Sequence, residues 1–193
     1  MSLTVEELLA REEIADVIKR LARGTDRPDE ELMASCYHPD GVDDHNAFRG
    51  SGADFARWVV TVLAHFTATM HFIGPPHITI GRDGDADLAD ADTYCVAHHI
   101  TDPAGAAGTA ESGSDPAPGP GPGSDPGPGS DMVLGLRYVD RFERRAGTWL
   151  IAKRVCAFDW TYTVPIDPTN RFVFEVGYTV GHRDRTDITY TGV

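Results

Sequence analysis

The sequence has few cysteines, no long apolar run and no export signal. Three cysteines occur among 193 residues, Cys36, Cys95 and Cys156, without a CxxC pair, so neither a disulfide framework nor a zinc finger is indicated. No apolar run approaches the roughly 20 residues of a membrane-spanning helix, and the N-terminus lacks a cationic region followed by an apolar one. We therefore expect reduced core cysteines in a cytoplasmic protein.

Basic residues are also scarce, because 17 Lys and Arg stand against 30 Asp and Glu, for a formal net charge of −13. A strongly acidic protein is repelled by nucleic acid and by anionic membranes. We expect neither as a partner, and a small hydrophobic molecule, neutral in charge, as the ligand. The length predicts a single domain over residues 1–193.

Helical periodicity marks the first part of the chain. Thr4 and Glu7 form a capping-box signature, and apolar residues recur at near-helical spacing from there to Gly24. Pro28 can occupy the first turn of a short second helix. Asp26 therefore falls in the break between two helices.

A third helix and several strands follow. Ser51 or Asp54 can cap the helix, which carries the apolar residues Phe55, Trp58, Val59, Val62, Leu63 and Phe66. The later periodicity predicts strands near residues 42–48, 69–73, 77–80, 88–101, 132–144 and 148–160, with a hairpin turn at Ala146–Gly147. Helices followed by an antiparallel meander predict an α+β fold.

The segment at about residues 103–131 differs from the rest of the chain. About half of it is Gly or Pro, a composition that cannot bury enough apolar area to offset its ordering entropy. We interpret it as a disordered hairpin insertion, which the fold tolerates because loop-closure cost rises slowly with length.

Asp26 and His71 together resemble a buried acid/base pair. A neutral imidazole in an apolar surround can accept a proton at neutral pH, and a carboxylate can orient the ring and stabilise the imidazolium. The alternative from the residues alone is a core histidine bonded to backbone and an Asp26 that caps the following helix.

A family resemblance favours the acid/base pair. The element order, the phrase at 36–42, the apolar run ending at Met70-His71, the strand pair at 142–149 and the tail at 181–187 resemble the SnoaL-like branch of the nuclear-transport-factor-2-like superfamily. The chain looks most like the scytalone dehydratase, bile acid dehydratase and lindane dehydrochlorinase group. This resemblance implies a cone-shaped, curved antiparallel β-sheet wrapped around N-terminal helices (α-α-β-α-β meander), with Asp26 and His71 at the catalytic positions.

Other family positions transfer less completely. Leu21 and Thr25 stand where some relatives carry an assisting Lys or Tyr, so that assistant is missing. His45 falls near an active-site Tyr of the dehydratase, and the two alternatives are that it replaces this Tyr as acid or hydrogen-bond donor or that it is a solvated loop residue. Arg154 corresponds to an arginine that stabilises a departing anion, and it shares a face with Leu150 and Ala152 by period two, although a surface position is the alternative.

Further residues complete the predicted site. Either His98 or His99 enters the cavity, since neighbours on a strand face opposite ways. The residues that we expect as pocket walls, with plain core as the alternative, are Leu21, Trp58, Phe66, Phe72 and Tyr94. The histidines and Asp26 could in principle converge on a metal, but no local ligand spacing is present and the relatives work without one. We expect no metal and no cofactor.

The resulting functional hypothesis is a cofactor-independent lyase, a dehydratase acting on a small hydrophobic cyclic substrate. An isomerase or cyclase could use the same base, and a non-catalytic ligand-binding or assembly module of the same fold is the alternative from another class. The C-terminal segment at about 162–193 carries Phe172, Val173, Phe174, Val176 and Tyr178, too apolar for a free tail. We expect it to cover the cone mouth or a neighbouring subunit. The resemblance implies a homotrimer or homodimer.

Overall fold

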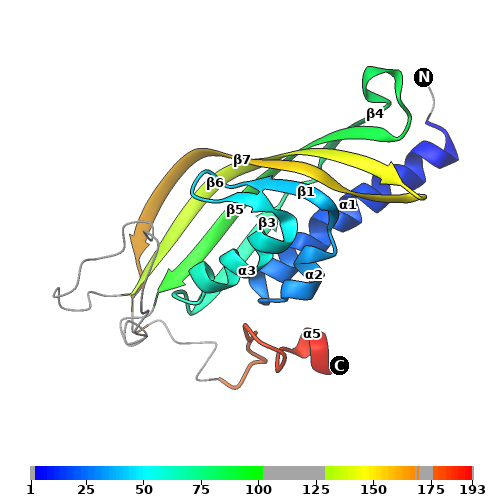
Figure 1. The fold of residues 1–193 in the computed structure, drawn as a ribbon. Helices are drawn as coiled ribbons and strands as arrows, with labels where there is room; N and C mark the ends of the chain where they lie inside the picture. Colours follow the sequence, from blue (N-terminus) through cyan, green and yellow to red (C-terminus); the bar gives the residue numbers. More distant parts are fainter. Residues whose placement is uncertain (1–2, 102–128, 168, 170–175, 193) are drawn as a thin grey trace.

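The computed structural model describes residues 3–101, 129–167, 169 and 176–192 (Figure 1). Its elements in chain order are α1 (Val5–Asp26), α2 (Glu30–Ala34), β1 (Tyr37–Asp44), β2 (Arg49–Ser51), α3 (Gly52–Leu63), β3 (Ala68–Ile73), β4 (His77–Ile80), η1 (Arg82–Gly84), β5 (Leu88–Thr101), β6 (Ser130–Arg145), β7 (Thr148–Pro165) and α5 (Ile188–Thr191). The predicted α+β class is confirmed. Most of the Gly/Pro-rich insertion lies outside the described residues, and β6 begins at Ser130, inside its predicted range.

The sheet has seven strands in the order β2-β1-β7-β6-β5-β3, with β4 also paired to β5. All pairings are antiparallel except β1 with β7, which is parallel. The mixed sheet corrects the purely antiparallel prediction. β1 and β7 are not joined by a hairpin, so nothing local forces them to run in opposite directions.

The sheet is curved, and the three N-terminal helices fill its concave side (Figure 1). The β6–β7 ladder shifts register twice, at Ala152 and at Asp159, where β7 carries one residue more than β6. Such bulges bend the strand that carries them. The long strands therefore arch over the helices, as the resemblance to a cone-shaped fold implies.

Helices α1 and α3 begin where the sequence predicts, whereas α2 begins at Glu30 with Asp29 as its N-cap, so Pro28 precedes the helix and does not lie in its first turn. Thr4 and Glu7 make the reciprocal capping box of α1, and the Ser51 side chain accepts from the backbone of Asp54 at the start of α3. The buried face of α1 carries Ala10, Ile14, Val17, Ile18 and Leu21, which join Phe142 and Ile151 of the sheet in one core. The turn at Ala146–Gly147 has two positive φ angles, 50° and 82°, as expected of a tight hairpin.

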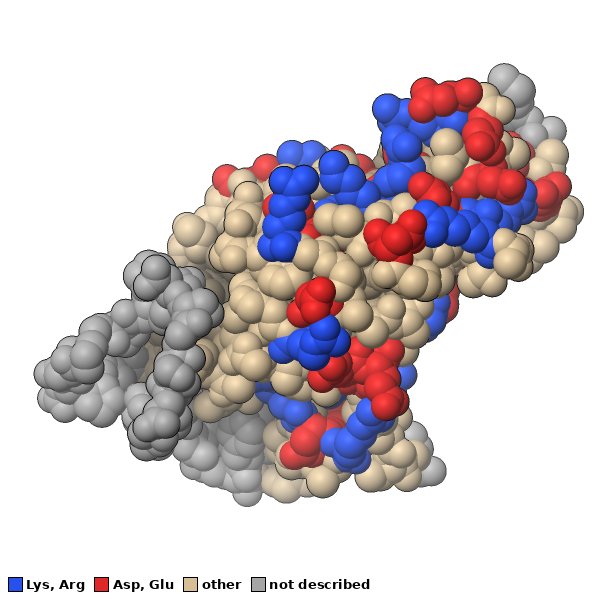
Figure 2. Space-filling view, viewed as in Figure 1, with Lys and Arg blue, Asp and Glu red and all other residues tan. Residues whose placement is uncertain are grey.

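The three cysteines are free and buried, as predicted. Among the described helices, none has both the length and the apolar character needed to span a bilayer. Lys and Arg alternate with Asp and Glu over the charged part of the surface in view, so the acidic excess is not gathered in one patch there (Figure 2).

Candidate active site

Asp26 is the last residue of α1, at the corner where the chain turns into α2. The helix reaches this corner because its apolar stripe, ending at Leu21, is buried against the concave side of the sheet. Gly24 allows α2 to approach closely, since a Cβ there would lie 2.7 Å from Cγ of Met33. The corner holds the Asp26 carboxylate against β3, where His71 lies.

Asp26 and His71 are joined by two hydrogen bonds. Nδ1 of His71 lies 2.8 Å from Oδ1 of Asp26, and the His71 backbone N–H donates to Oδ2, also at 2.8 Å. Burial alone would raise the pKa of Asp26, but its hydrogen bonds and charge interaction with His71 outweigh burial and lower that pKa. With a carboxylate at Nδ1, the neutral ring carries its proton there, and Nε2 has no partner among the described residues.

His99 is the second histidine that faces this side of the sheet. Its ring meets the ring of His71 edge to face, with centroids 5.4 Å apart, and the ring of Phe66 lies 4.9 Å away. Burial, followed by the charge of His71, lowers the pKa of His99 to about 4. His99 is therefore uncharged at neutral pH.

His98 points to the opposite face of the sheet, and this corrects its inclusion among the catalytic residues. Its Nδ1 lies 2.7 Å from Asp131, and its side chain is 38% exposed. Phe72 and Tyr94 also lie on that outer face, 70% and 67% exposed, so they do not line a pocket with His71. The reason is the two-residue period of a strand, which turns Phe72 away wherever His71 points inward.

His45 has a carboxylate partner of its own. Nδ1 of His45 lies 2.5 Å from Oδ1 of Asp43, and the Tyr37 hydroxyl donates to Oδ2 at 2.5 Å. Asp43 is fully buried, and the His45 ring stacks on Phe55 with centroids 4.5 Å apart. His45 is therefore not a solvated loop residue. The sequence analysis did not select Asp43 or Tyr37, although the Asp-x-His spacing of 43 and 45 at a strand end is a usable signal.

Arg154 points inward but is already occupied. Its Nε and Nη2 donate to the two carboxylate oxygens of Asp140, both at 2.7 Å, and its guanidinium lies over the Tyr138 ring. Burial opposes the charge, but Asp140 outweighs burial and raises the pKa of Arg154. Its face also differs from the prediction, because the bulge at Ala152 separates Arg154 from Leu150 and aligns it with Trp149 and Ile151.

The other predicted pocket residues belong mainly to the core. Leu21 is 1% exposed, and Trp58 and Phe66 are partly buried against the same cluster. The pocket that borders Asp26 and His71 has a volume of about 320 Å³ and lies between α1, β3 and α5. Lys19, Arg23 and Arg27 are among its lining residues, and none of the five predicted wall residues is.

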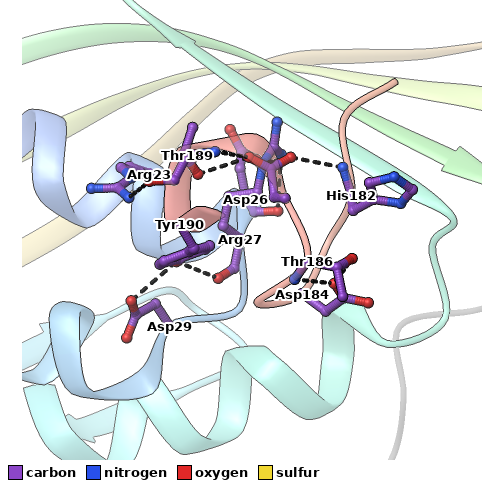
Figure 3. A network of polar contacts seen from close by, with 10 residues as sticks. Arg23, Asp26, Arg27, Asp29, His182, Asp184, Thr186, Thr189 and Tyr190 are labelled. Carbon is purple, nitrogen blue, oxygen red and sulfur yellow. Dashed lines mark hydrogen bonds and ion pairs between the residues drawn. The ribbon is translucent and has the colours of Figure 1, made fainter. Parts of the chain in front are cut away.

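The C-terminal segment lies against the corner that holds Asp26 (Figure 3). Asp187 is buried, forms an ion pair with Arg27 at 3.1 Å, and accepts from the backbone N–H of His182. Hydrogen bonds from the backbone and side chain of Thr189, followed by that of His182, lower the pKa of Asp187. The described part of the predicted covering segment therefore contacts the edge of the site.

The contacts of Tyr190 and Arg183 extend this docking. Tyr190 donates its hydroxyl to Asp29 at 3.0 Å, and Arg183 donates to the carbonyls of Leu63 and Phe66 at the end of α3. Phe172, Val173 and Phe174, which the sequence analysis placed in the cover, lie outside the described residues. Arg183 was not singled out from the sequence, since no periodic pattern or spacing links it to Asp26.

No three His, Cys, Asp or Glu side chains in the described part of the chain lie together as a metal site would require. The described geometry places two histidines against carboxylates, His71 with Asp26 and His45 with Asp43, an arrangement typical of acid/base chemistry.

Several solved structures are similar to this chain. A type 2 hexachlorocyclohexane dehydrochlorinase has a TM-score of 0.64 at 14% identity, covering 86% of this chain and 98% of that one. A type 3 enzyme of the same name from Novosphingobium barchaimii has a TM-score of 0.64 at 15% identity, covering 85% and 98%. A putative scytalone dehydratase from Novosphingobium aromaticivorans has a TM-score of 0.59 at 16% identity, covering 88% and 99%.

At these identities the similarity establishes the fold, a cone of curved sheet around helices. No protein of curated function matches the sequence at a significant level. The model of the SnoaL-like domain, however, matches residues 6–155, a range that includes Asp26, His71 and the other inward-facing polar residues up to Arg154. The chain belongs to the SnoaL-like domain family.

Proposed function

We propose that this protein is a cofactor-independent lyase, a dehydratase that acts on a small hydrophobic cyclic substrate with His71 as its general base. The observation that carries the proposal is the double hydrogen bond between Asp26 and His71, which fixes the ring and leaves Nε2 without a partner among the described residues. The similarity to a dehydrochlorinase and to a putative scytalone dehydratase supports the same reaction class.

The elimination then proceeds as a proton transfer coupled to loss of a leaving group. Nε2 of His71 takes a proton from carbon, the electrons of the C–H bond form a C=C bond, and the C–O bond to the hydroxyl breaks. Asp26 stabilises the imidazolium that forms. The imidazolium form of His45, oriented at Nδ1 by Asp43, donates from Nε2 the proton that converts the departing hydroxide to water. His99 suits a hydrogen bond to the substrate, because burial keeps its ring uncharged.

We further propose that the protein assembles through the outer face of the sheet, as a homotrimer or homodimer. Met70, Phe72 and Tyr94 are each more than 60% exposed on that face, and β7 adds Trp160 and Tyr162 at about half exposure. Exposed apolar side chains in such a group are typical of a protein interface. The buried reduced cysteines support a cytoplasmic location.

The test is a screen of small cyclic alcohols and β-hydroxy ketones with the wild-type protein in D₂O, followed by mass spectrometry. Loss of one water from a compound, abolished in His71→Ala, is the expected result. Deuterium uptake with no change of composition would instead identify an isomerase or cyclase that uses the same base. Turnover that survives in His71→Ala would contradict the proposed base.

A further inference from the structure

Arg183 is anchored at one end of its guanidinium only. Nη1 donates to the carbonyl oxygens of Leu63 and Phe66, at 2.6 and 2.5 Å, where α3 ends. Helix C-terminal carbonyls carry partial negative charge and lack partners within the helix, so they hold a cation well. The anchor fixes the plane of the guanidinium group and the direction of its remaining N–H groups.

The opposite edge of the Arg183 guanidinium has no partner. Nε and Nη2 are buried and make no hydrogen bond, and within the described ranges no carboxylate lies at ion-pair distance from this side chain. Buried N–H groups of a charged side chain without acceptors are costly, and such groups in a folded protein call for an explanation. A functional site is one such explanation.

The free edge is the one with which arginine binds a carboxylate side-on. Arg154 shows this in the same protein, because its Nε and Nη2 receive the two oxygens of Asp140 at 2.7 Å each. Two parallel N–H groups match the two oxygens of a planar anion. Arg183 therefore has the binding edge that Arg154 uses, with no anion on it.

The Arg183 guanidinium interacts through its charge with Asp26 and His99, the two side chains that contact the proposed base. Burial lowers the pKa of Arg183, and the nearby charge of Asp26 acts in the opposite direction. The Arg183 charge also contributes to lowering the pKa of His99, whose ring contacts that of His71. Phe66, which accepts a bond from Arg183, packs its ring against His99 as well.

The C-terminal segment that carries Arg183 is held to the rest of the protein by polar contacts of the residues that follow Arg183. Asp187 pairs with Arg27 and accepts from His182, and Tyr190 donates to Asp29 (Figure 3). Because the free nitrogens are closed off from solvent, an anion reaches them only when the segment or a neighbouring ring moves slightly. Polar contacts at a surface can open and re-form without unfolding the core.

We propose that Arg183 binds a carboxylate of the substrate through its Nε and Nη2, so that the substrate of the His71 site is a small cyclic carboxylic acid. This inference rests on the proposed function and adds a substrate class to it. It also replaces the expectation of a neutral ligand, which rested on the net charge of −13 of the whole chain. The local charge differs, because the pocket at Asp26 and His71 is lined by Lys19, Arg23 and Arg27.

The experiment compares cyclohexanecarboxylate with its neutral amide, cyclohexanecarboxamide, as ligands in isothermal titration calorimetry at neutral pH. The wild type is expected to bind the acid at least tenfold more tightly than the amide. Arg183→Gln should lose this preference, and Arg183→Lys should keep part of it, because a lysine retains the charge without the two-pronged edge. Arg57→Gln removes an exposed arginine of α3 and serves as the matched control.

Two results would overturn the inference: equal or absent binding of acid and amide to the wild type, or an unchanged preference in a folded Arg183→Gln or Arg183→Lys protein. His71→Gln separates the inference from the proposed function. It should bind the acid as the wild type does while losing turnover. Turnover that persists without His71 would refute the base yet leave the Arg183 result standing.

Discussion

Asp26 contacts His71 through both of its carboxylate oxygens, one on the imidazole Nδ1 and one on the backbone N–H of the same residue. The double contact fixes the ring relative to the strand that carries it, so the direction of Nε2 is set by the backbone of β3. In the proposed role of His71 as general base, a ring held in this way loses little side-chain entropy when substrate binds.

If His45 is the proton donor, the loss of its partner Asp43 should slow the reaction. Asp43→Asn should lower kcat by roughly a hundredfold, because the amide no longer holds the orientation of the His45 ring as the carboxylate does. Asp44→Asn, at the next and partly exposed position, is the control. Steady-state kinetics on the substrate found by screening provides the measurement, and equal kcat values for the two variants would remove His45 from the mechanism.

His99 predicts a pH dependence of stability. Its folded pKa of about 4 lies below the ordinary histidine value near 6.5, so between these values the unfolded chain binds a proton that the folded protein does not. The free energy of unfolding should therefore fall as the pH drops from about 6.5 to 4, by up to about 3 kcal/mol more than in His99→Gln. Urea titrations at several pH values test this, and parallel pH profiles would contradict it.

The buried ion pair of Arg154 and Asp140 should contribute to the free energy of unfolding, in place of the catalytic role expected for Arg154. Arg154→Ala leaves a fully buried carboxylate unpaired and should cost about 3–5 kcal/mol of unfolding free energy. Arg141→Ala breaks the partly exposed pair with Asp90 on the outer face and should cost about 1 kcal/mol or less. Chemical denaturation measures both losses of unfolding free energy. Equal losses in the two variants would contradict the larger stabilisation that we expect from the buried pair.

A substitution at Phe72 tests the proposed assembly surface on the outer face of the sheet. Phe72→Glu places a charge in the exposed apolar group of the outer face and should convert an oligomer to a monomer without loss of fold. Light scattering coupled to size exclusion gives the mass of each form. Glu12→Gln, an exposed change on α1, away from the outer face of the sheet, should leave assembly intact. A wild-type protein that is monomeric at high concentration would refute the proposed interface.

The sequence predicted the elements whose signals are local. The capping box at Thr4, the Ser51 cap and the turn at Ala146–Gly147 each depend on a few neighbouring residues, and all three are present. Strand β5 has its predicted bounds because its alternation is continuous. The pairing of Asp26 with His71 came from family resemblance, because no local pattern joins residues that far apart.

What the sequence did not predict depends on non-local geometry. The face of Arg154 relative to Leu150 changed because of one extra residue at Ala152, which only the partner strand defines. The parallel pairing of β1 with β7 likewise could not be predicted, because it depends on the path of the chain between two strands that are far apart in the sequence. Arg183 reaches the end of α3 through docking of the C-terminal segment, and no periodic pattern in the sequence indicates this contact.

The most direct test of the central claim compares His71→Ala with His98→Ala in the rate at which the identified substrate loses its proton. Both histidines have an Asp at Nδ1, but His71 lies on the concave side and His98 on the outer face. His71→Ala should slow the reaction by at least a hundredfold, and His98→Ala should leave it within about twofold of the wild type. Equal rates in the two variants, or full activity without His71, would contradict the account.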